Sequence, residues 1–286
     1  MGARPNRRTI PRARRPSRPW PRVKALQRFA RRRWREATTV FHAVSKTPPV
    51  TRVLTGTVLL LLLFLTVNWI YHTITKPSEV FFALDRSLDK SLPQSWREYG
   101  PLFREHATAV ITPELLAALA QVESNGNPVA RTYWRWHWSW NPLTWYQPAS
   151  SAVGMFQLTD GTFQAAKRFC IHDHHVVEDG PWHDQHSCWF NSFYTRVIPS
   201  HAIEMTAALL DRRVTQELAT WPKATPKQKH RLAAVIHLCG AGAGHTFALR
   251  RFRLTPHQRC GDHDVRTYLT RVDILKQQFS KLNAAG

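Results

Sequence analysis

A glutamate at the end of a predicted helix is the first residue with an evident chemical use. Apolar side chains recur at helical spacing along 113–124, at Leu115, Leu119 and Val122. Glu123 lies at the edge of this stripe, just before an Asn-Gly break in the helix. Burial of a carboxyl in a dry cleft is expected to raise its pKa and keep it protonated near neutral pH. A general acid for glycosidic cleavage needs this property, although most glutamates near a helix end lie on the surface.

Three further motifs follow Glu123-Ser124 along the chain. They are the turn Gly154-Met155-Phe156-Gln157, the segment LCGAGAGH at 238–245, and VRTYLTRV, which contains Tyr268. In this order the motifs resemble the lytic transglycosylases of the lysozyme-like superfamily (glycoside hydrolase family 23) and their soluble-lytic-transglycosylase (SLT) catalytic domain. Those enzymes carry a Glu-Ser at a helix end, a Gly-Leu-Met-Gln turn, an Ala-Tyr-Asn-Ala-Gly-type segment and a tyrosine on a late helix. The resemblance covers residues 111–282.

The resemblance implies that Glu123 is the catalytic residue and acts on peptidoglycan glycan strands. It would protonate the oxygen of the MurNAc-GlcNAc β-1,4 bond and then, as a carboxylate, remove the proton of the muramyl C6 hydroxyl. That hydroxyl would attack the anomeric carbon, so the product is a 1,6-anhydro-MurNAc end and no water is consumed. Intramolecular attack needs no second carboxylate. We expect neither a cofactor nor a metal.

The other matched positions are predicted to bind substrate. Gln157 and the backbone around Phe156 would hold N-acetyl groups, and Gly154 would let the chain approach the sugar closely. Tyr268 would orient Glu123 or touch substrate. The remaining substrate-binding residues predicted from the motifs are Ser124 and Met155.

The sequence departs from the family pattern in its third motif. Cys239 and Gly240 stand where the family has Tyr and Asn, so the contacts that relatives make there cannot be carried over. Close to the Gly-x-x-Gln turn, Asp160 is interpreted as a helix N-cap or first-turn acid. If Asp160 instead activates water, as in a goose-type lysozyme, the alternative function is that of a hydrolytic muramidase.

A tryptophan-rich segment, YWRWHWSWNPLTWYQP, lies between Glu123 and Gly154. Aromatic faces stack well on sugars, and we predict substrate contacts for Trp136, Trp138 and Trp140. Two other interpretations remain open. The segment could form a hairpin or wall packed on the core, or it could dock to a membrane or a partner.

A histidine-rich segment lies between two cysteines, Cys170 and Cys188. Its histidines are His172, His174, His175, His183 and His186. Imidazoles at short spacings could bind zinc or nickel, but no standard ligand motif is present. We therefore interpret this segment as a structural or solvated loop and keep metal binding as the alternative.

All four cysteines follow the apolar segment described below, which fits an oxidising compartment. Proximity in sequence favours the disulfides Cys170–Cys188 and Cys239–Cys260, and buried free thiols remain the alternative.

Residues 53–74 form a predicted membrane span. These 22 residues contain no Lys, Arg, Asp or Glu, and as a helix they reach about 33 Å, enough to cross the hydrocarbon core. Trp69 and Tyr71 lie where an interfacial aromatic belt would place them. A cleaved signal peptide would have a short basic region before the apolar segment and a small-residue cleavage site after it. Neither is evident, so we expect an uncleaved anchor.

The residues before the span are strongly basic. Of the 40 Lys and Arg in the chain, 16 lie in residues 1–52, against one acidic residue, Glu36. The positive-inside rule therefore predicts a single-pass protein of the bacterial inner membrane, with a cytoplasmic N-terminus and a periplasmic catalytic domain. The basic tail would contact anionic lipid or a specific cytoplasmic partner, and we expect no nucleic acid. A role as a wall-opening or scaffold component of a secretion or conjugation machine is a further alternative.

The chain after the span is predicted to be predominantly α, without a strand series. Three helices are expected at or soon after Thr-Pro pairs: Thr112-Pro113, Thr225-Pro226 and Thr255-Pro256, the last beginning only at Asp262 or Asp264. Another helix is expected over 199–218. The predicted architecture is mainly α: a basic tail (1–52), a transmembrane anchor (53–75), a helical stalk (76–110) and a lysozyme-like transglycosylase domain (111–286).

Overall fold

The structure, a computed structural model, describes residues 47–84, 86–184 and 187–285. The chain divides into two units, residues 1–66 and 67–286. Most of the predicted basic tail, residues 1–46, lies outside the described residues, and so does His186. The fold is mainly helical, as the sequence predicts.

The first long element is the helix α2 (Pro49–Thr75), with 27 residues. It contains the predicted span, and it is long and apolar enough to cross a membrane. Its leucines from Leu59 to Leu63 are all exposed, unlike those of a core helix.

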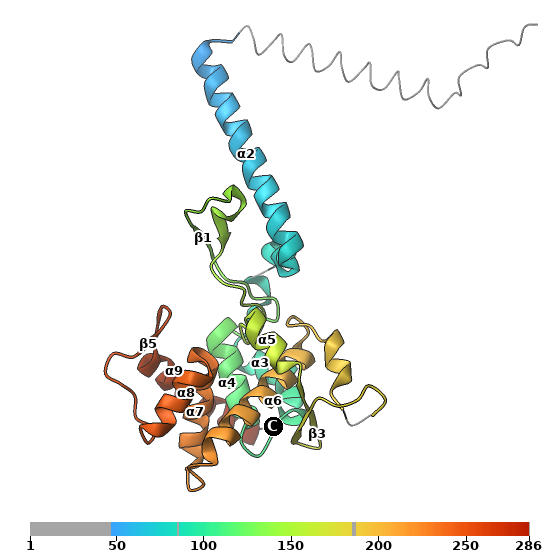
Figure 1. The fold of residues 1–286 in the computed structure, drawn as a ribbon, viewed down its shortest axis with the longest axis vertical. Coiled ribbons are helices and arrows are strands. Elements are labelled where there is room, and N and C mark those ends of the chain that lie inside the picture. Colours follow the sequence, from blue (N-terminus) through green and yellow to red (C-terminus); the bar gives the residue numbers. More distant parts are fainter. Residues whose placement is uncertain (1–46, 85, 185–186, 286) are drawn as a thin grey trace, which may run out of the picture. The chain divides into compact units, whose positions relative to one another are not determined.

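Seven α-helices of the described chain form the helical body of the second unit (Figure 1). They are α3 (Leu92–Glu105), α4 (Pro113–Ser124), α5 (Asp160–Ala166), α6 (Pro199–Leu218), α7 (Pro226–Cys239), α8 (Ala241–Leu249) and α9 (Val265–Ala285). Short 3-10 helices join them: η1 (Pro77–Ala83), η2 (Arg86–Leu88), η3 (Pro142–Thr144) and η4 (Trp189–Phe193). Helix α4 packs mainly against α9 and α3, and α7 packs against α8, α6 and α9.

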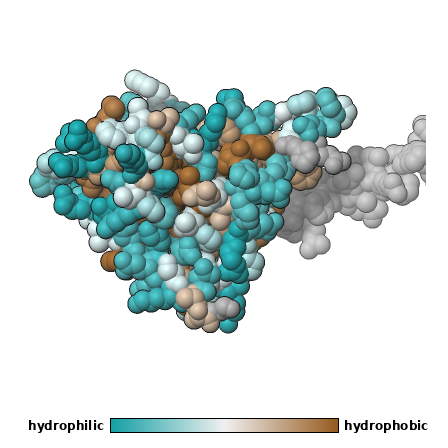
Figure 2. All heavy atoms as spheres, turned by 90° about the horizontal axis from the view of Figure 1, so that it is seen from below, coloured by the Kyte–Doolittle hydropathy of each residue, from teal (hydrophilic) through white to brown (hydrophobic). Residues whose placement is uncertain are grey.

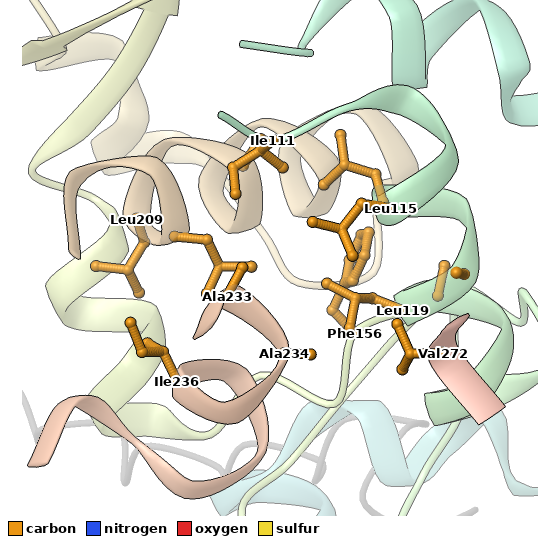
Figure 3. Packing of buried hydrophobic residues seen from close by; sticks show 14 of the residues in the cluster. Ile111, Leu115, Leu119, Phe156, Leu209, Ala233, Ala234, Ile236 and Val272 are labelled. Carbon is orange, nitrogen blue, oxygen red and sulfur yellow. The ribbon is translucent and has the colours of Figure 1, made fainter. Parts of the chain in front are cut away.

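The core lies between α4, α6, α7 and α9. Leu115 and Leu119 of α4 point toward Leu209 of α6, Ile236 of α7 and Val272 of α9 (Figure 3). Burying each such side chain stabilises the fold by roughly 1.5–3 kcal/mol. The face of the molecule in Figure 2 is, by contrast, largely hydrophilic, with scattered hydrophobic residues.

The helix boundaries follow from local capping. Thr112 and Thr225 accept hydrogen bonds from the backbone of their first turns, and a proline follows each of them. Asp264 Oδ1 accepts a 2.8 Å hydrogen bond from the Thr267 amide and so caps α9. Helix α4 ends at Ser124, and its C-cap, Asn125, has a left-handed φ of 52°. The predicted helices at 113–124, 199–218 and 226–239 are therefore confirmed.

Three short antiparallel hairpins interrupt the helices of the described chain. They pair β1 (Trp134–Trp136) with β2 (Tyr146–Pro148), β3 (Phe169–His172) with β4 (His175–Glu178), and β5 (Arg259–Cys260) with β6 (His263–Asp264). Both predicted disulfides are present, each with one cysteine in a hairpin strand. Cys170 of β3 bonds to Cys188, and Cys260 of β5 bonds to Cys239 at the end of α7.

The predicted stalk, 76–110, requires a correction. Its second half forms α3, which packs on α4, α6 and α9. Tyr99 and Phe103 are buried in the same core as α4. The apolar residues of α3 therefore belong to the helical body, and in the described part of this segment η1 and η2 precede α3.

Candidate active site

A cleft of about 990 Å³ opens on the helical body next to the end of α4. Its walls come from the ends of α4 and α7, the loops 131–135 and 149–159, the hairpin β5–β6 and the first turn of α9. The ionisable residues that line it are Glu123, Arg131, Tyr133, Arg135, His237, Asp262, His263, Asp264, Tyr268 and Arg271. Phe156 and Gln157 also line it.

Glu123 lies in the last turn of α4 and contacts two polar side chains from other helices. The hydroxyl of Tyr268, on α9, donates a 2.6 Å hydrogen bond to Glu123 Oε1. His237 Nε2, on α7, lies 3.5 Å from the same oxygen. The Glu123 side chain is 14% exposed, so the carboxylate reaches the cleft while most of it is buried.

The pKa of Glu123 differs from the sequence-based expectation. Burial is the largest single influence and raises this pKa, as expected. The hydrogen bond and charge of His237, the hydrogen bond from Tyr268 and the charge of His263 together outweigh burial. The pKa of Glu123 therefore lies below the ordinary glutamate value, and the expected increase is wrong. Two of the side chains that lower this pKa, His237 and His263, were not included in the sequence analysis.

Tyr268 is suited to be a permanent hydrogen-bond donor. It is 5% exposed, and burial together with the charge and hydrogen bond of Glu123 raises its pKa well above the ordinary tyrosine value. Its hydroxyl therefore stays protonated over the range in which a glutamate titrates.

Side-chain hydrogen bonds to backbone carbonyls hold the Gly-x-x-Gln turn against the end of α4 and the loop after it. The Ser124 hydroxyl donates to the Met155 carbonyl at 2.8 Å and so ties the end of α4 to the Gly-x-x-Gln turn. Gly154 has a φ of 81°, and a Cβ there would overlap with the carbonyl oxygen of Arg196. Gln157 Nε2 donates to the carbonyls of Ala130 and Gly154. These contacts place Phe156 and Gln157 in the wall of the cleft.

The sequence of this part of the chain matches a known family. Residues 101–226 match the family model described as the transglycosylase SLT domain. The chain contains a transglycosylase SLT domain. The SLT domain family comprises lytic transglycosylases that act on peptidoglycan, so the chain is an enzyme of this class with peptidoglycan as its substrate. Separate comparisons with curated proteins and with solved structures gave no match.

The matched range of the SLT domain includes Glu123 and the Gly154–Gln157 turn, whereas His237 and Tyr268 lie beyond it. Folding brings both of these side chains to Glu123. His237 was missed in the sequence analysis because it precedes the third motif. Its place two residues before Cys239, on the last turn of α7, is the one signal that could have identified it.

Some of the predicted substrate-binding residues of the SLT domain line the cleft, and others do not. Phe156, Gln157 and Tyr268 line the cleft with Glu123. The lining residues do not include Ser124, Gly154 and Met155. Ser124 ties the helix end to Met155, which is fully buried, and the missing Cβ of Gly154 accommodates the Arg196 backbone instead of a sugar.

The three tryptophans predicted to bind substrate are not cleft residues. Trp136, Trp138 and Trp140 belong to the β1–β2 hairpin or its loop and are 65%, 89% and 104% exposed. None of them lines the cleft, because the hairpin extends beyond the helical body (Figure 1). Tyr133 and Arg135, at the base of the hairpin, line the cleft instead.

Asp160 does not have the position of a water-activating base. It is the first residue of α5, and it forms a 2.8 Å ion pair with Arg196. It is not among the residues lining the cleft, where the acidic residues besides Glu123 are Asp262 and Asp264.

The histidine-rich segment forms the β3–β4 hairpin and the loop after it. His172 Nε2 lies 3.5 Å from the sulfur of disulfide-bonded Cys170, and the Ala107 carbonyl accepts a 2.8 Å hydrogen bond from His174 Nδ1. Within the described ranges, no three His, Cys, Asp or Glu side chains are grouped as a metal site.

Proposed function

We propose that Glu123 is the single acid and base of a lytic transglycosylase that forms 1,6-anhydro-MurNAc ends. Its proton passes to the glycosidic oxygen as the bond from that oxygen to the muramyl anomeric carbon breaks. The carboxylate then takes the proton of the muramyl C6 hydroxyl, whose oxygen bonds to the anomeric carbon. Glu123 is thereby reprotonated, and the reaction is balanced without water. The observation that carries this proposal is the Tyr268–Glu123 hydrogen bond inside the cleft.

We further propose that His237 supplies the proton that a glutamate of lowered pKa would otherwise lack. Glu123 and His237 can share one proton, either as carboxylate and imidazolium or as neutral acid and neutral imidazole. Substrate excludes water from the cleft, and desolvation disfavours two charges more than none. Binding therefore moves the shared proton to Glu123, where it can be donated.

Hydrolysis is the less favoured outcome. A hydrolytic enzyme needs a second carboxylate to activate water or to act as a nucleophile. Asp160 is paired with Arg196 at the surface, and Asp264 caps α9. Asp262 is therefore the cleft carboxylate through which a hydrolytic reaction would have to proceed.

We propose that α2 anchors the enzyme in the bacterial inner membrane. The support is its apolar length and the basic excess of residues 1–52. In this topology the tail is cytoplasmic, and residues 76–286 face peptidoglycan in the periplasm.

The test of the catalytic assignment is Glu123→Gln in the full chain, assayed in detergent on purified sacculi. We expect an unchanged fold and a loss of turnover of at least ~10³-fold. Glu98→Gln, at a half-exposed carboxylate on α3, is the matched control and should retain the parent rate. A Glu123→Gln enzyme with near-parent turnover would refute the assignment.

A further inference from the structure

The loop of the β1–β2 hairpin is attached to the last turns of α2. The Leu143 carbonyl, in this loop, accepts hydrogen bonds from Asn68 Nδ2 at 2.8 Å and from His72 Nε2 at 2.9 Å. Both side chains are buried although they belong to a predominantly apolar helix. The hairpin loop therefore pairs Asn68 Nδ2 and His72 Nε2, polar atoms that would be costly to expose to hydrocarbon.

The base of the hairpin is fixed to the segment that follows α2. Glu79 of η1 is fully buried and accepts hydrogen bonds from Arg131 Nη1 at 2.6 Å and Trp134 Nε1 at 2.9 Å. Lys76 Nζ lies 3.2 Å from its other oxygen. Loop and base are thus both held against residues 68–79, so the hairpin is a fixed extension of this end of the helix.

The side chains that this hairpin exposes are those of a membrane interface. Trp138 and Trp140 are almost fully exposed, and segment 133–149 contains five tryptophans and no Asp or Glu. The loop is ordered by its own contacts: Trp145 Nε1 donates to the Ser139 carbonyl at 2.7 Å, and Asn141 caps η3. Tryptophan is enriched where an apolar layer meets water.

The depth of the loop follows from its hydrogen-bond partners. Asn68 lies six residues before Ile74, the last residue of the predicted span. At 1.5 Å per residue this places Asn68 about 9 Å inside the end of the span. The loop bonded to Asn68 and His72 therefore lies beside the last two turns of the predicted span, at its periplasmic end.

We infer that the β1–β2 hairpin is a second membrane contact, in which Trp138 and Trp140 insert into the periplasmic interface of the bilayer that α2 spans. This inference rests on the proposed anchor. It replaces the sugar contacts predicted for these tryptophans, and it assigns a lipid surface as their partner. Because the base of the hairpin also lines the cleft, this contact would hold the active site near the membrane.

Fluorescence quenching in the full chain, reconstituted in phosphatidylcholine vesicles with or without brominated acyl chains, tests this contact. The emission of Trp138 and Trp140 is the difference between the parent and the W138F/W140F variant. Phenylalanine retains a ring at both exposed positions, so the fold is preserved. Trp69→Phe, in α2, gives the reference for a membrane residue. Trp182→Phe, which removes an exposed indole remote from the hairpin, gives the reference for a solvent residue.

We expect bromine to quench the emission of Trp138 and Trp140 as strongly as that of Trp69. Quenching no stronger than that of Trp182, in a chain that resists alkaline carbonate extraction, would overturn the hairpin contact and leave the anchor intact. That result would also be obtained if the tryptophans face a protein or glycan. Release of the chain by carbonate would overturn the anchor and, with it, the placement of the hairpin.

Discussion

The hydroxyl of Tyr268 and the carboxylate of Glu123 are joined by a 2.6 Å hydrogen bond between side chains 145 residues apart. The bond exists because α9 packs along α4, which brings the first turn of α9 to the end of α4. Tyr268 is held protonated by burial, so it can stabilise the carboxylate form of Glu123 whenever that form appears. The proposed catalytic carboxylate is therefore positioned by the core, not by a flexible loop.

Replacing Tyr268 with Phe removes this donor and leaves the ring in place. A hydrogen bond to a charged group contributes roughly 1.5–3 kcal/mol, so we expect kcat/KM on sacculi to fall by about 10- to 100-fold. Tyr194→Phe is the matched control, because Tyr194 donates a similar 2.7 Å bond to Glu204 outside the cleft. Equal effects of the two substitutions would mean that the Tyr268 hydroxyl has only a structural role.

Replacing His237 with Gln tests the shared proton. Burial of Glu123 remains in the variant while the influence of His237 is lost, so the pKa of Glu123 should rise. The last proton of the site must then reside on Glu123 alone. Because an imidazole ordinarily holds a proton to higher pH than a carboxyl, the alkaline limb of the kcat/KM profile should move down by about one pH unit.

The control for His237 is another histidine–carboxylate pair. His245 Nδ1 lies 2.8 Å from Glu217, away from the cleft, and His245→Gln should leave the pH profile unchanged. An alkaline limb that stays in place in the His237→Gln enzyme would exclude His237 as the proton source.

Local sequence signals predicted much of the fold. The Thr-Pro pairs and the Asn-Gly break set the ends of α4 and the start of α7, because capping depends on neighbouring residues. Helix α9 begins directly after Asp264, one of the two expected starts. A hairpin was considered only for the tryptophan-rich segment, as an alternative, and the other two hairpins were not predicted, since strands of two to four residues carry little periodicity. The stalk was misjudged because spacing identifies an apolar face but not its packing partner.

The candidate site was predicted only in part, because spacing identifies residues but not how the helices that carry them pack. Motifs identified Glu123, Phe156, Gln157 and Tyr268, which the structure places in one cleft. Neither the position of His237 nor its effect on the pKa of Glu123 can be predicted from spacing, because both depend on how α7 packs against α4. Exposed tryptophans near a predicted glycan site were assigned to substrate although the hairpin carries them away from the cleft.

The Cys239–Cys260 disulfide should support both stability and substrate binding. It closes a loop with a sequence separation of 21, and Cys239→Ser/Cys260→Ser should lower the free energy of unfolding by about 3 kcal/mol. Both cysteines line the cleft, and the loop between them carries Asp262 and His263, so KM should rise as well. Guanidinium unfolding and assays on sacculi measure these effects.

The other disulfide provides the comparison. Cys170–Cys188 has a similar sequence separation, 18, but lies outside the cleft. Its double serine variant should lose similar stability without a change in KM. A rise in KM of the same size in both variants would show that general destabilisation, not the cleft loop, is responsible.

The central claim is that a single carboxyl promotes intramolecular attack by the C6 hydroxyl. The most direct test of this claim is to determine the source of the oxygen at the cleaved muramyl carbon. Sacculi are digested by the full-length enzyme in water enriched in a heavy oxygen isotope, and the fragments are analysed by mass spectrometry. We predict muramyl ends that are one water lighter than reducing ends and contain no heavy oxygen. Reducing ends that carry heavy oxygen from the first turnovers would contradict the account, because a water molecule would then have attacked in place of the C6 hydroxyl.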